Sequence, residues 1–438
     1  MRWALAARLA AAVSLLLVSG CADPAPDPAD WTTYHHDNGR SGVAVGLAPL
    51  GTLTRAWVAR LDGAVYGQPL AVGNRIFAAT ENDTVYALAA DSGRVLWSTH
   101  VGTPVPLAQL PCGNIDPLGI TSTMVYDPRT ALLFALAETG GGRHVLVSVD
   151  AATGAVRERR AAEPPTGDRI AHQQRAALNL VGGRVYIAYG GLAGDCANYV
   201  GAVVALPTTG ATRPLSYHIP TRREGGIWAP GGATVVGDRL MYAVGNGEST
   251  TGYDGSDSVI ALNRDLELVD RFTPSSWPQD NSSDADLGSM TPAAAGGYVY
   301  ADGKRGVGYT VRPDRLGGIG GQVAQAPVCP AYGGAAVSGN TVYVPCQDGP
   351  RAVTIGADGG ITVGWRAEMS GGGSPVVGGG AVWVVDTGMG SLTALDPATG
   401  AVRQRLPVGD VSHFASPTLA HNRAYVPTLT GVVAVAGA

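Results

Sequence analysis

One short segment recurs along this chain of 438 residues and limits the folds that the chain can adopt. It reads TVYALAADSGRVLW from Thr84 to Trp97, VLVSVDAATGAVRE from Val145 to Glu158 and SLTALDPATGAV from Ser391 to Val402. More divergent copies run from Ala202 to Pro214 and from Ser258 to Asp270. The clearest copies join two strand-like runs through a turn rich in Asp, Ser or Thr, and Gly. A turn repeated in this way predicts a repeat architecture.

A second hairpin pattern precedes these segments and consists of an apolar run, a turn at Gly, Asn or Asp, and a strand with Tyr, Phe or Trp. It occurs eight times, beginning at Gln68, Ser122, Ala176, Gly232, Thr291, Gly334, Ser374 and Ser416. Units of about forty to sixty residues with four short strands are typical of β-propellers. We therefore expect an all-β fold, an eight-bladed β-propeller with four-stranded blades. A pair of β-sandwiches is the alternative, but sandwiches do not require similar hairpins in register.

The two ends of the propeller segment are complementary. The final repeat stops at GVVAVAGA, before a fourth strand, whereas LGTLTRAWVARLDG from Leu50 to Gly63 precedes the first hairpin and has no partner of its own. We expect Leu53 to Leu61 to pair with Val432 to Val435 and to complete the last blade. Such a join buries two strand edges that would otherwise stay open.

The N-terminus has the features of an export signal. Arg2 and Arg8 precede or flank the apolar run LAAAVSLLLV, which ends in VSGC at Cys21. The run is too short to span a bilayer as a mature helix, and the small residues before Cys21 resemble a bacterial lipobox. We predict a lipoprotein signal peptide at 1–21 with lipidation of Cys21, a Pro- and Asp-rich tether at 22–30 and a propeller at 31–438. The mature protein is then lipid-anchored on the extracytoplasmic side of the membrane. An ordinary cleaved signal is the alternative.

Four cysteines remain after Cys21, an even number that predicts two disulfides in an exported chain. Cys329 and Cys346 flank one hairpin, so we pair them, which leaves Cys112 with Cys196. A metal site is the alternative, but no two of these cysteines have CxxC spacing and no histidine lies near them in the sequence.

The repeat resembles that of the eight-bladed propellers with pyrroloquinoline quinone (PQQ)-type repeats. The pattern VYALDAxTGxxxW of that family is matched from Val85 to Trp97 and from Leu392 to Val402. The family includes quinoprotein alcohol dehydrogenases, and also outer-membrane assembly lipoproteins that act as protein-binding scaffolds. The resemblance covers nearly all of the mature chain and implies the propeller fold, whereas many members bind no quinone.

The resemblance also implies positions for a cofactor site. Glu138, in FALAETGGGRHVLVSVD, is placed like a calcium-ligating glutamate of the dehydrogenases, and Asn246, in YAVGNGEST, resembles the asparagine that is another calcium ligand. Trp228, in GGIWAPGG, is similar to the aromatic floor under the quinone. Each residue also has a structural interpretation, as a turn residue for Glu138 and Asn246 and as blade packing for Trp228.

Two further positions would carry the chemistry. Asp286, in NSSDADLGSM, is similar in its order along the chain to the catalytic aspartate, with Asp284 as the alternate. Lys304, the only lysine of the chain, stands where the family has an Arg or Lys that polarises the quinone oxygen. Taken alone, Asp286 is better explained as a loop cap and Lys304 as a solvated charge.

The chain departs from the dehydrogenase pattern in three respects. It has no adjacent cysteines, which in the dehydrogenases form a disulfide over the cofactor. Its tryptophans are few and irregularly spaced, whereas the dehydrogenases have a Trp-rich docking pattern between blades. Asp30 and Trp31 keep the opening of the dehydrogenase signature, but His35 and His36 stand where a Gly and a basic residue would follow.

These observations leave two functions. The favoured one is a binding scaffold, which presents loops such as LPCGNIDPLGITST (110–123) and WPQDNSSDADLGS (277–289) to a protein partner at the cell surface. The alternative is a PQQ- and calcium-dependent dehydrogenase that oxidises an alcohol or a sugar. The net charge of −5 gives no support to nucleic-acid binding, and we expect a monomer.

Overall fold

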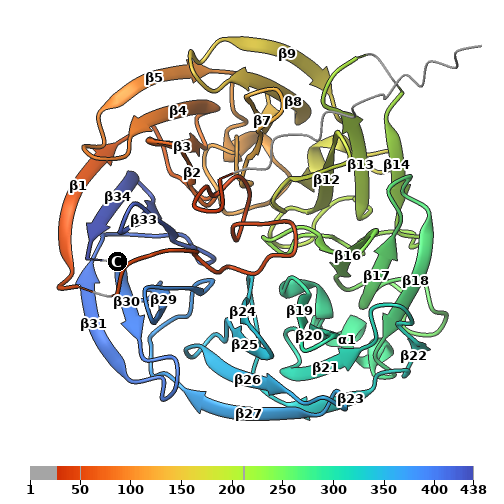
Figure 1. Ribbon diagram of the computed structural model, residues 1–438. Coiled ribbons are helices and arrows are strands. Elements are labelled where there is room, and N and C mark those ends of the chain that lie inside the picture. Colours follow the sequence, from red (N-terminus) through yellow and green to blue (C-terminus); the bar gives the residue numbers. More distant parts are fainter. Residues whose placement is uncertain (1–26, 50, 211–212, 438) are drawn as a thin grey trace, which may run out of the picture.

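The computed structural model describes residues 27–49, 51–210 and 213–437. The predicted signal peptide with Cys21, and residues 22–26 of the predicted tether, lie outside these ranges. Within them, eight sheets of short and mostly antiparallel strands form a ring around a central axis (Figure 1). The predicted all-β, eight-bladed propeller is confirmed.

The first four blades follow the chain in order. Blade 1 contains β2 (Leu70–Val72), β3 (Arg75–Thr80), β4 (Thr84–Ala89) and β5 (Val95–His100). Blade 2 contains β6 (Val125–Asp127), β7 (Leu132–Thr139), β8 (Arg143–Asp150) and β9 (Val156–Ala161). Blade 3 contains β11 (Asn179–Val181), β12 (Arg184–Gly191), β13 (Ala202–Pro207) and β14 (Leu215–His218), with β10 (His172–Gln173) on the end of β12. Blade 4 contains β15 (Thr234–Val236), β16 (Arg239–Val244), β17 (Ser258–Leu262) and β18 (Leu268–Thr273).

The remaining blades continue around the ring. Blade 5 contains β19 (Ala293–Ala295), β20 (Tyr298–Ala301), β21 (Val307–Val311) and β23 (Ala324–Pro327), and β22 (Gly318–Ile319) joins blade 4 parallel to β18. Blade 6 contains β24 (Ala336–Ser338), β25 (Thr341–Val344), β26 (Arg351–Ile355) and β27 (Ile361–Arg366). Blade 7 contains β28 (Val376–Gly378), β29 (Ala381–Asp386), β30 (Ser391–Leu395) and β31 (Val402–Pro407). Blade 8 contains β32 (Thr418–Ala420), β33 (Arg423–Thr428), β34 (Gly431–Ala436) and β1 (Thr54–Arg60). Within the described ranges, the helical segments are α1 (Trp277–Ser283) and the 3-10 turns Leu107–Gln109, Arg169–Ala171 and Leu287–Ser289.

The ring closes between the two ends of the propeller, as predicted. β1 pairs antiparallel with β34, in a register that runs from Thr54 opposite Ala436 to Arg60 opposite Gly431. Figure 1 shows β1 as the outer strand of the blade formed by the C-terminal strands. The N-terminal strand therefore gives blade 8 its fourth member and leaves no gap between the first and last repeats.

The repeated turn has a chemical basis that Asp150 illustrates. Its Oδ1 accepts the main-chain N–H groups of Ala152 and Thr153 at 3.0 and 2.9 Å, and Gly154 then adopts a φ of +76°. A left-handed φ favours glycine because a side chain there is strained. An ion pair with Arg157 lowers the pKa of Asp150 to about 2. Each Asp-x-x-Thr-Gly copy thus specifies its own hairpin locally.

Three tryptophans join neighbouring blades in one common geometry. Each lies on the outer strand of one blade, covers the turn glycine of the next blade and donates its Nε1–H group to a carbonyl of that turn. The sets are Trp57 with Gly93 and Ala90, Trp97 with Gly154 and Ala151, and Trp365 with Gly400 and Pro397, with N···O distances of 3.1, 3.2 and 2.9 Å. The sequence-based view that the tryptophans lack a docking pattern is therefore wrong at these junctions. The number of residues between successive tryptophans varies along the chain, but the same Trp–Gly contact recurs between neighbouring blades.

Residues 31–43 cross the centre of the ring and block one end of its channel (Figure 1). Trp31 pairs with Ala71 of blade 1, and Val43 pairs with Val377 of blade 7. Between these two bridges, the His35 ring contacts Ala335 O and Ser416 Oγ, both at 3.0 Å. We call residues 31–43 the plug. It includes the two histidines at which the sequence departs from the dehydrogenase signature, and burial lowers the pKa of His35 to about 3.

Both predicted disulfides are present, Cys112–Cys196 and Cys329–Cys346. Disulfides are typical of proteins outside the cytoplasm, which agrees with the expected extracytoplasmic location. Among the described residues, no helix has the length and apolar character needed to cross a membrane.

Candidate functional site

A cavity of about 330 Å³ lies at the centre of the ring, on the face opposite the plug. Its walls come from the loops between successive blades and the loops that follow the second strand of a blade, which open on the same face because the strands alternate in direction. The lining side chains are Tyr66, Asn114, Gln173, Arg175, Asp195, Trp228, Asn246, Asp284, Lys304, His413 and Phe414, with the backbone of Gly191–Gly194. Loops from six blade junctions and from within three blades therefore meet at this point.

Aromatic rings form one wall of the cavity. The Trp228 and Phe414 ring centroids are 6.2 Å apart, and His413 stacks on Phe414 at 4.6 Å with an interplanar angle of 11°. Tyr332 adds a further ring 5.8 Å from His413. Burial and the positive charge of Arg175 lower the pKa of His413, so its imidazole is neutral at physiological pH. The wall offers flat apolar surfaces of the kind that hold a planar ligand.

Lys304 brings positive charge to this wall. Its Nζ lies 5.4 Å from the centroid of the Trp228 ring and contacts Asp284 Oδ1 at 2.5 Å and Asp286 Oδ2 at 2.7 Å. Burial alone would lower the pKa of Lys304, but the two carboxylates raise it well above its usual value. Asp286 is fully buried, and desolvation raises its pKa despite the lysine. Asp284 is exposed and borders the cavity.

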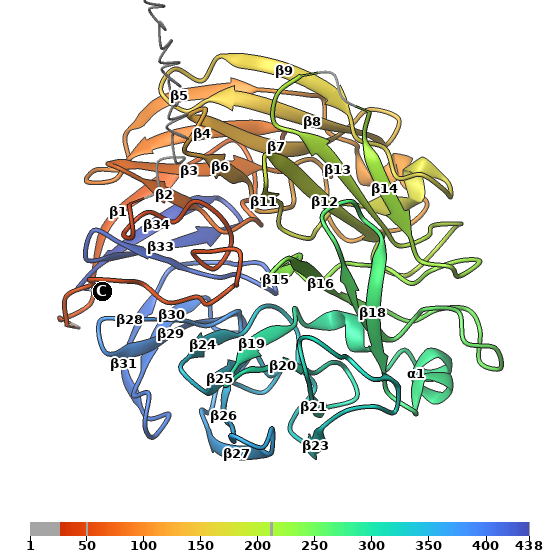
Figure 2. The same cartoon turned by 45° about the vertical axis from the view of Figure 1, so that its right-hand side comes forward.

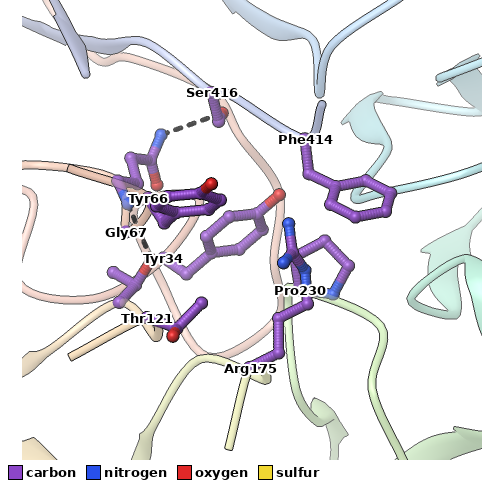
Figure 3. A pocket seen from close by; sticks show the side chains of 10 residues that line it. Tyr34, Tyr66, Gly67, Thr121, Arg175, Pro230, Phe414 and Ser416 are labelled. Carbon is purple, nitrogen blue, oxygen red and sulfur yellow. Dashed lines mark hydrogen bonds between the residues drawn. The ribbon is translucent and has the colours of Figure 1, made fainter. Parts of the chain in front are cut away.

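Arg175 extends from the segment after β10 to the ring axis. Its guanidinium carbon lies 4.2 Å from the Phe414 centroid and 5.8 Å from the Tyr66 centroid. Figure 3 shows the guanidinium between Pro230, Phe414 and the hydroxyl end of Tyr34, which comes from the plug. Arg175 thus lies between the cavity and a second, much smaller pocket that is lined by Tyr34 of the plug.

The Cys112–Cys196 disulfide holds two of the loops at the mouth of the cavity. Cys112 precedes Asn114 in the loop between blades 1 and 2, and Cys196 follows Asp195 in the loop after β12. Both Asn114 and Asp195 line the cavity. The bond therefore fixes the distance between two wall segments that are 84 residues apart in sequence.

The structure brings together four of the sequence-predicted site residues. Trp228, Asn246 and Lys304 line the cavity, as does Asp284, which the sequence offered only as the alternate to Asp286. Asp286 lies behind Lys304, where it has no exposed surface and does not border the cavity. The difference arises because the chain turns at Asp284, which has a left-handed φ of +52° at the end of α1.

Glu138 does not join this group. It lies on β7 and is 2% exposed, its Oε1 accepts the N–H of Gln174 at 2.6 Å, and its Oε2 is 3.7 Å from His144 Nε2. Burial raises the pKa of Glu138 well above its usual value. Its carboxyl group therefore supports the loop that carries Gln173 and Arg175 from behind, and it does not line the cavity.

Sequence reasoning missed Arg175, Tyr66, His413 and Phe414. None belongs to a repeat motif, and the four residues come from parts of the chain up to about 350 residues apart. The segment HQQRAAL around Arg175 differs from the apolar openings of the other blades by its run of polar residues. That difference was the one signal that could have drawn attention to Arg175.

The fold and the cavity define a propeller of the quinoprotein dehydrogenase-like class. Residues 52–232 and 319–437 match the family described as outer membrane protein assembly factor BamB, and the chain belongs to this family of PQQ-type repeat proteins. A polyvinylalcohol dehydrogenase from Sphingopyxis sp. (strain 113P3) is 27% identical over 304 residues, in an alignment that covers 59% of this chain and 42% of the relative. The matched part is thus less than half the length of that relative.

Two solved structures show how widely this fold is shared. The quinohemoprotein alcohol dehydrogenase ADHIIG from Pseudomonas putida HK5 superposes with a TM-score of 0.72 at 15% identity, covering 93% of this chain and 80% of that one. BamB from Moraxella catarrhalis superposes with a TM-score of 0.61 at 17% identity, covering 88% of this chain and 99% of that one. At these identities the likeness concerns the fold.

The cavity fits the organic part of a quinone cofactor better than its metal. Aromatic rings beside Arg175 and Lys304 suit a planar ligand with carboxylates. A calcium ion prefers six to eight oxygen ligands, usually with several carboxylates. In the described ranges no three His, Cys, Asp or Glu side chains are grouped to hold a metal ion, and Asn246 stands in the wall without Glu138.

Proposed function

We propose that the central cavity binds PQQ or a closely similar planar, carboxylated quinone, and that the protein is a quinone-dependent oxidoreductase of the extracytoplasmic space. The observation that carries this proposal is the convergence of the Trp228 ring, the Lys304 ammonium group and the Asp284 carboxylate on one wall. A scaffold needs a rigid surface for its partner, but it does not need an ion pair over an aromatic ring inside a central cavity.

Each side chain would have a distinct part in such a reaction. The bound quinone supplies a two-electron acceptor. Trp228 provides a flat surface for the ring, and Lys304 stabilises negative charge beside it. Asp284, which is exposed at the wall and held by Lys304, is positioned to accept the hydroxyl proton of a substrate alcohol. Buried Asp286 fixes Lys304 from the opposite side, as a positioning residue.

The substrate class that we propose is a compound with an oxidisable hydroxyl group, an alcohol or a sugar. The similarity to a polyvinylalcohol dehydrogenase supports an alcohol. The mouth of the cavity is bordered by exposed loop residues such as Asn114 and Ala193, so an extended substrate could reach it from the solvent.

Quinone binding by the purified protein tests this proposal. Isothermal titration with PQQ should give a Kd in the micromolar range or below, and Trp228→Ala should weaken binding by about 5- to 10-fold, because a ring stacked on the ligand contributes about 1 kcal/mol or a little more. Trp228→Phe, which keeps an aromatic face, is the matched control and should retain most of the affinity. Asp284→Asn should bind the quinone normally and lose dye-linked oxidation of alcohols.

A binding scaffold is the second candidate function. The likeness to BamB over most of both chains supports it, as do exposed positions within the segments 110–123 and 277–289, among them Asn114, Asp116 and residues 282–284. If the wild-type protein binds no quinone in calorimetry, the dehydrogenase proposal is wrong and the scaffold becomes the better interpretation.

A further inference from the structure

Arg175 carries a positive charge that the described part of the chain leaves without a partner. Its buried Nε has no hydrogen-bond acceptor among the described residues, and no ion pair between described residues involves its guanidinium group. A guanidinium group has five N–H donors, and buried polar groups in proteins are nearly always hydrogen-bonded. Burial lowers the pKa of Arg175 to about 10, so the group remains charged at neutral pH.

The neighbours of Arg175 do not neutralise it. Phe414 and Tyr66 present ring faces, which attract a cation weakly. Glu81 is a carboxyl group that acts on its charge, but no ion pair joins the two side chains: Glu81 Oε2 accepts the N–H of Gly119 at 2.8 Å and the hydroxyl of Thr121 at 3.2 Å, and Oε1 has no hydrogen-bond partner among the described residues. Burial raises the pKa of Glu81 to about 7, which reduces its negative charge near neutrality. The described residues therefore leave the charge of Arg175 without a paired counter-ion.

The carboxylates in the cavity wall, Asp195 and Asp284, and Asp286 behind the wall already have partners. Asp284 and Asp286 are both bound by Lys304. Asp195 accepts the hydroxyl of Tyr199 at 2.5 Å. A divalent cation placed in the cavity would therefore compete with an ammonium group already at 2.5 and 2.7 Å from two of these three carboxylates. The uncompensated charge on the wall is positive, which suits an anion and not a second cation.

We propose that Arg175 anchors a carboxylate of the ligand through a two-pronged ion pair, and that ligand binding needs no divalent metal ion. This inference rests on the proposed function, since it concerns the ligand of the same cavity. Guanidinium and carboxylate groups match in geometry and form paired hydrogen bonds. Arg175 then does for the anionic ligand what calcium is expected to do in the dehydrogenases that this chain resembles.

Titration of the wild-type protein with PQQ, in buffer with EGTA and in buffer with calcium chloride, tests the metal independence. The two Kd values should agree within about threefold. A Kd that is measurable only with calcium would overturn the inference and leave the proposed function in place. Absence of binding in both buffers would overturn the proposed function and the inference together, so the two failures are distinguishable.

Substitution of Arg175 tests the anchor. Arg175→Met should weaken PQQ binding by about 10- to 100-fold in both buffers, as expected for the loss of a charged hydrogen-bonded pair. Arg175→Lys keeps the charge but lacks the planar guanidinium group, so its affinity for PQQ should lie between those of wild type and Arg175→Met. Arg159→Met, on the exposed outer strand β9, is the control and should bind like wild type.

A structural role for Arg175 predicts a different pattern. If the guanidinium only filled the axis, Arg175→Met would lower the Tm of the ligand-free protein and leave the affinity of the folded fraction unchanged, which would refute the anchor. We expect the opposite, an unchanged or higher Tm without ligand, because the substitution removes an unpaired charge from poorly solvated surroundings.

Discussion

Asp83 shows how strongly one buried carboxyl group can influence this molecule. It lies in the turn between β3 and β4 with no exposed surface, and neither of its side-chain oxygens has a hydrogen-bond partner among the described residues. The carboxyl group packs against the backbone of Gly102 and Gly119, where even a methyl group would be too close. Burial, and then the charge of Glu81, raise the pKa of Asp83 to about 8.

This pKa makes stability depend on pH. An unfolded aspartate titrates near pH 4, so between about pH 4 and 8 the folded protein keeps a proton that the unfolded chain has released. The free energy of unfolding therefore falls as pH rises through this window, by up to about 1.4 kcal/mol per pH unit for one group. Asp83→Asn, which is neutral at every pH, should match wild type in Tm at pH 4 and exceed it at pH 8.5.

Thermal unfolding from pH 4 to 9 measures this effect. Asp410→Asn makes the same change at an exposed position and should leave the slope of Tm against pH unaltered. Parallel profiles for Asp83→Asn and wild type would mean that Asp83 is ionised in the folded protein.

At the scale of the elements, blade junctions depend on a glycine under an indole ring. A Cβ atom on Gly154 would lie 2.7 Å from the Trp97 ring, and Gly154 also has a left-handed φ of +76°. Gly73, in the turn between β2 and β3, has a similar φ of +56° but open space around the Cβ position. Substitution of Gly73 therefore measures the cost of backbone strain alone, whereas substitution of Gly154 measures that cost together with the loss of the contact with Trp97.

Alanine at these positions should give unequal losses. Gly73→Ala should lower the free energy of unfolding by about 1–2 kcal/mol, the cost of a left-handed alanine. Gly154→Ala should lose about 1–3 kcal/mol more, because the indole of Trp97 has to move and its hydrogen bond to Ala151 O is disturbed. Urea unfolding curves of both variants give the comparison, and equal losses would argue against the Trp–Gly contact as a stabilising feature.

At the scale of the whole molecule, two N-terminal segments complete the ring in different ways. The plug, residues 31–43, closes one end of the channel, and β1 closes the seam between blades 8 and 1. Figure 2 shows β1 running beside β34 along the edge of the ring. Trp57 on β1 is 8% exposed and also docks on blade 1, so the seam is stabilised by strand pairing and by packing.

Replacing residues 54–60 with a Gly-Ser segment of equal length should open this seam. The change removes the pairing with β34 and the burial of Trp57, a loss of several kcal/mol, and should lower the Tm by roughly 5 °C or more, because one kcal/mol corresponds to about 1–2 °C in a domain of this size. The same replacement of β9, an outer strand away from the seam, is the control and should cost less. If both variants melt alike, closure contributes no stability of its own.

The sequence by itself determined the blade count, the closing strand and both disulfides. These features follow from local rules, because each repeat forms its own hairpins, as the Asp150 turn illustrates, and contacts its neighbours in chain order. Counting the strand-like runs along the chain reveals one extra strand before the first hairpin and one missing strand after the last hairpin.

Only the tertiary structure decided the composition of the cavity. Arg175, Trp228, Asp284 and Phe414 have no common motif and meet because loops from different blades converge on one axis. Glu138 was a reasonable prediction from its local sequence, yet its carboxyl group turns to Gln174 behind the wall. Periodicity identifies the strands of a closed ring, whereas the direction in which each loop side chain points is set by contacts with residues that are distant in the sequence.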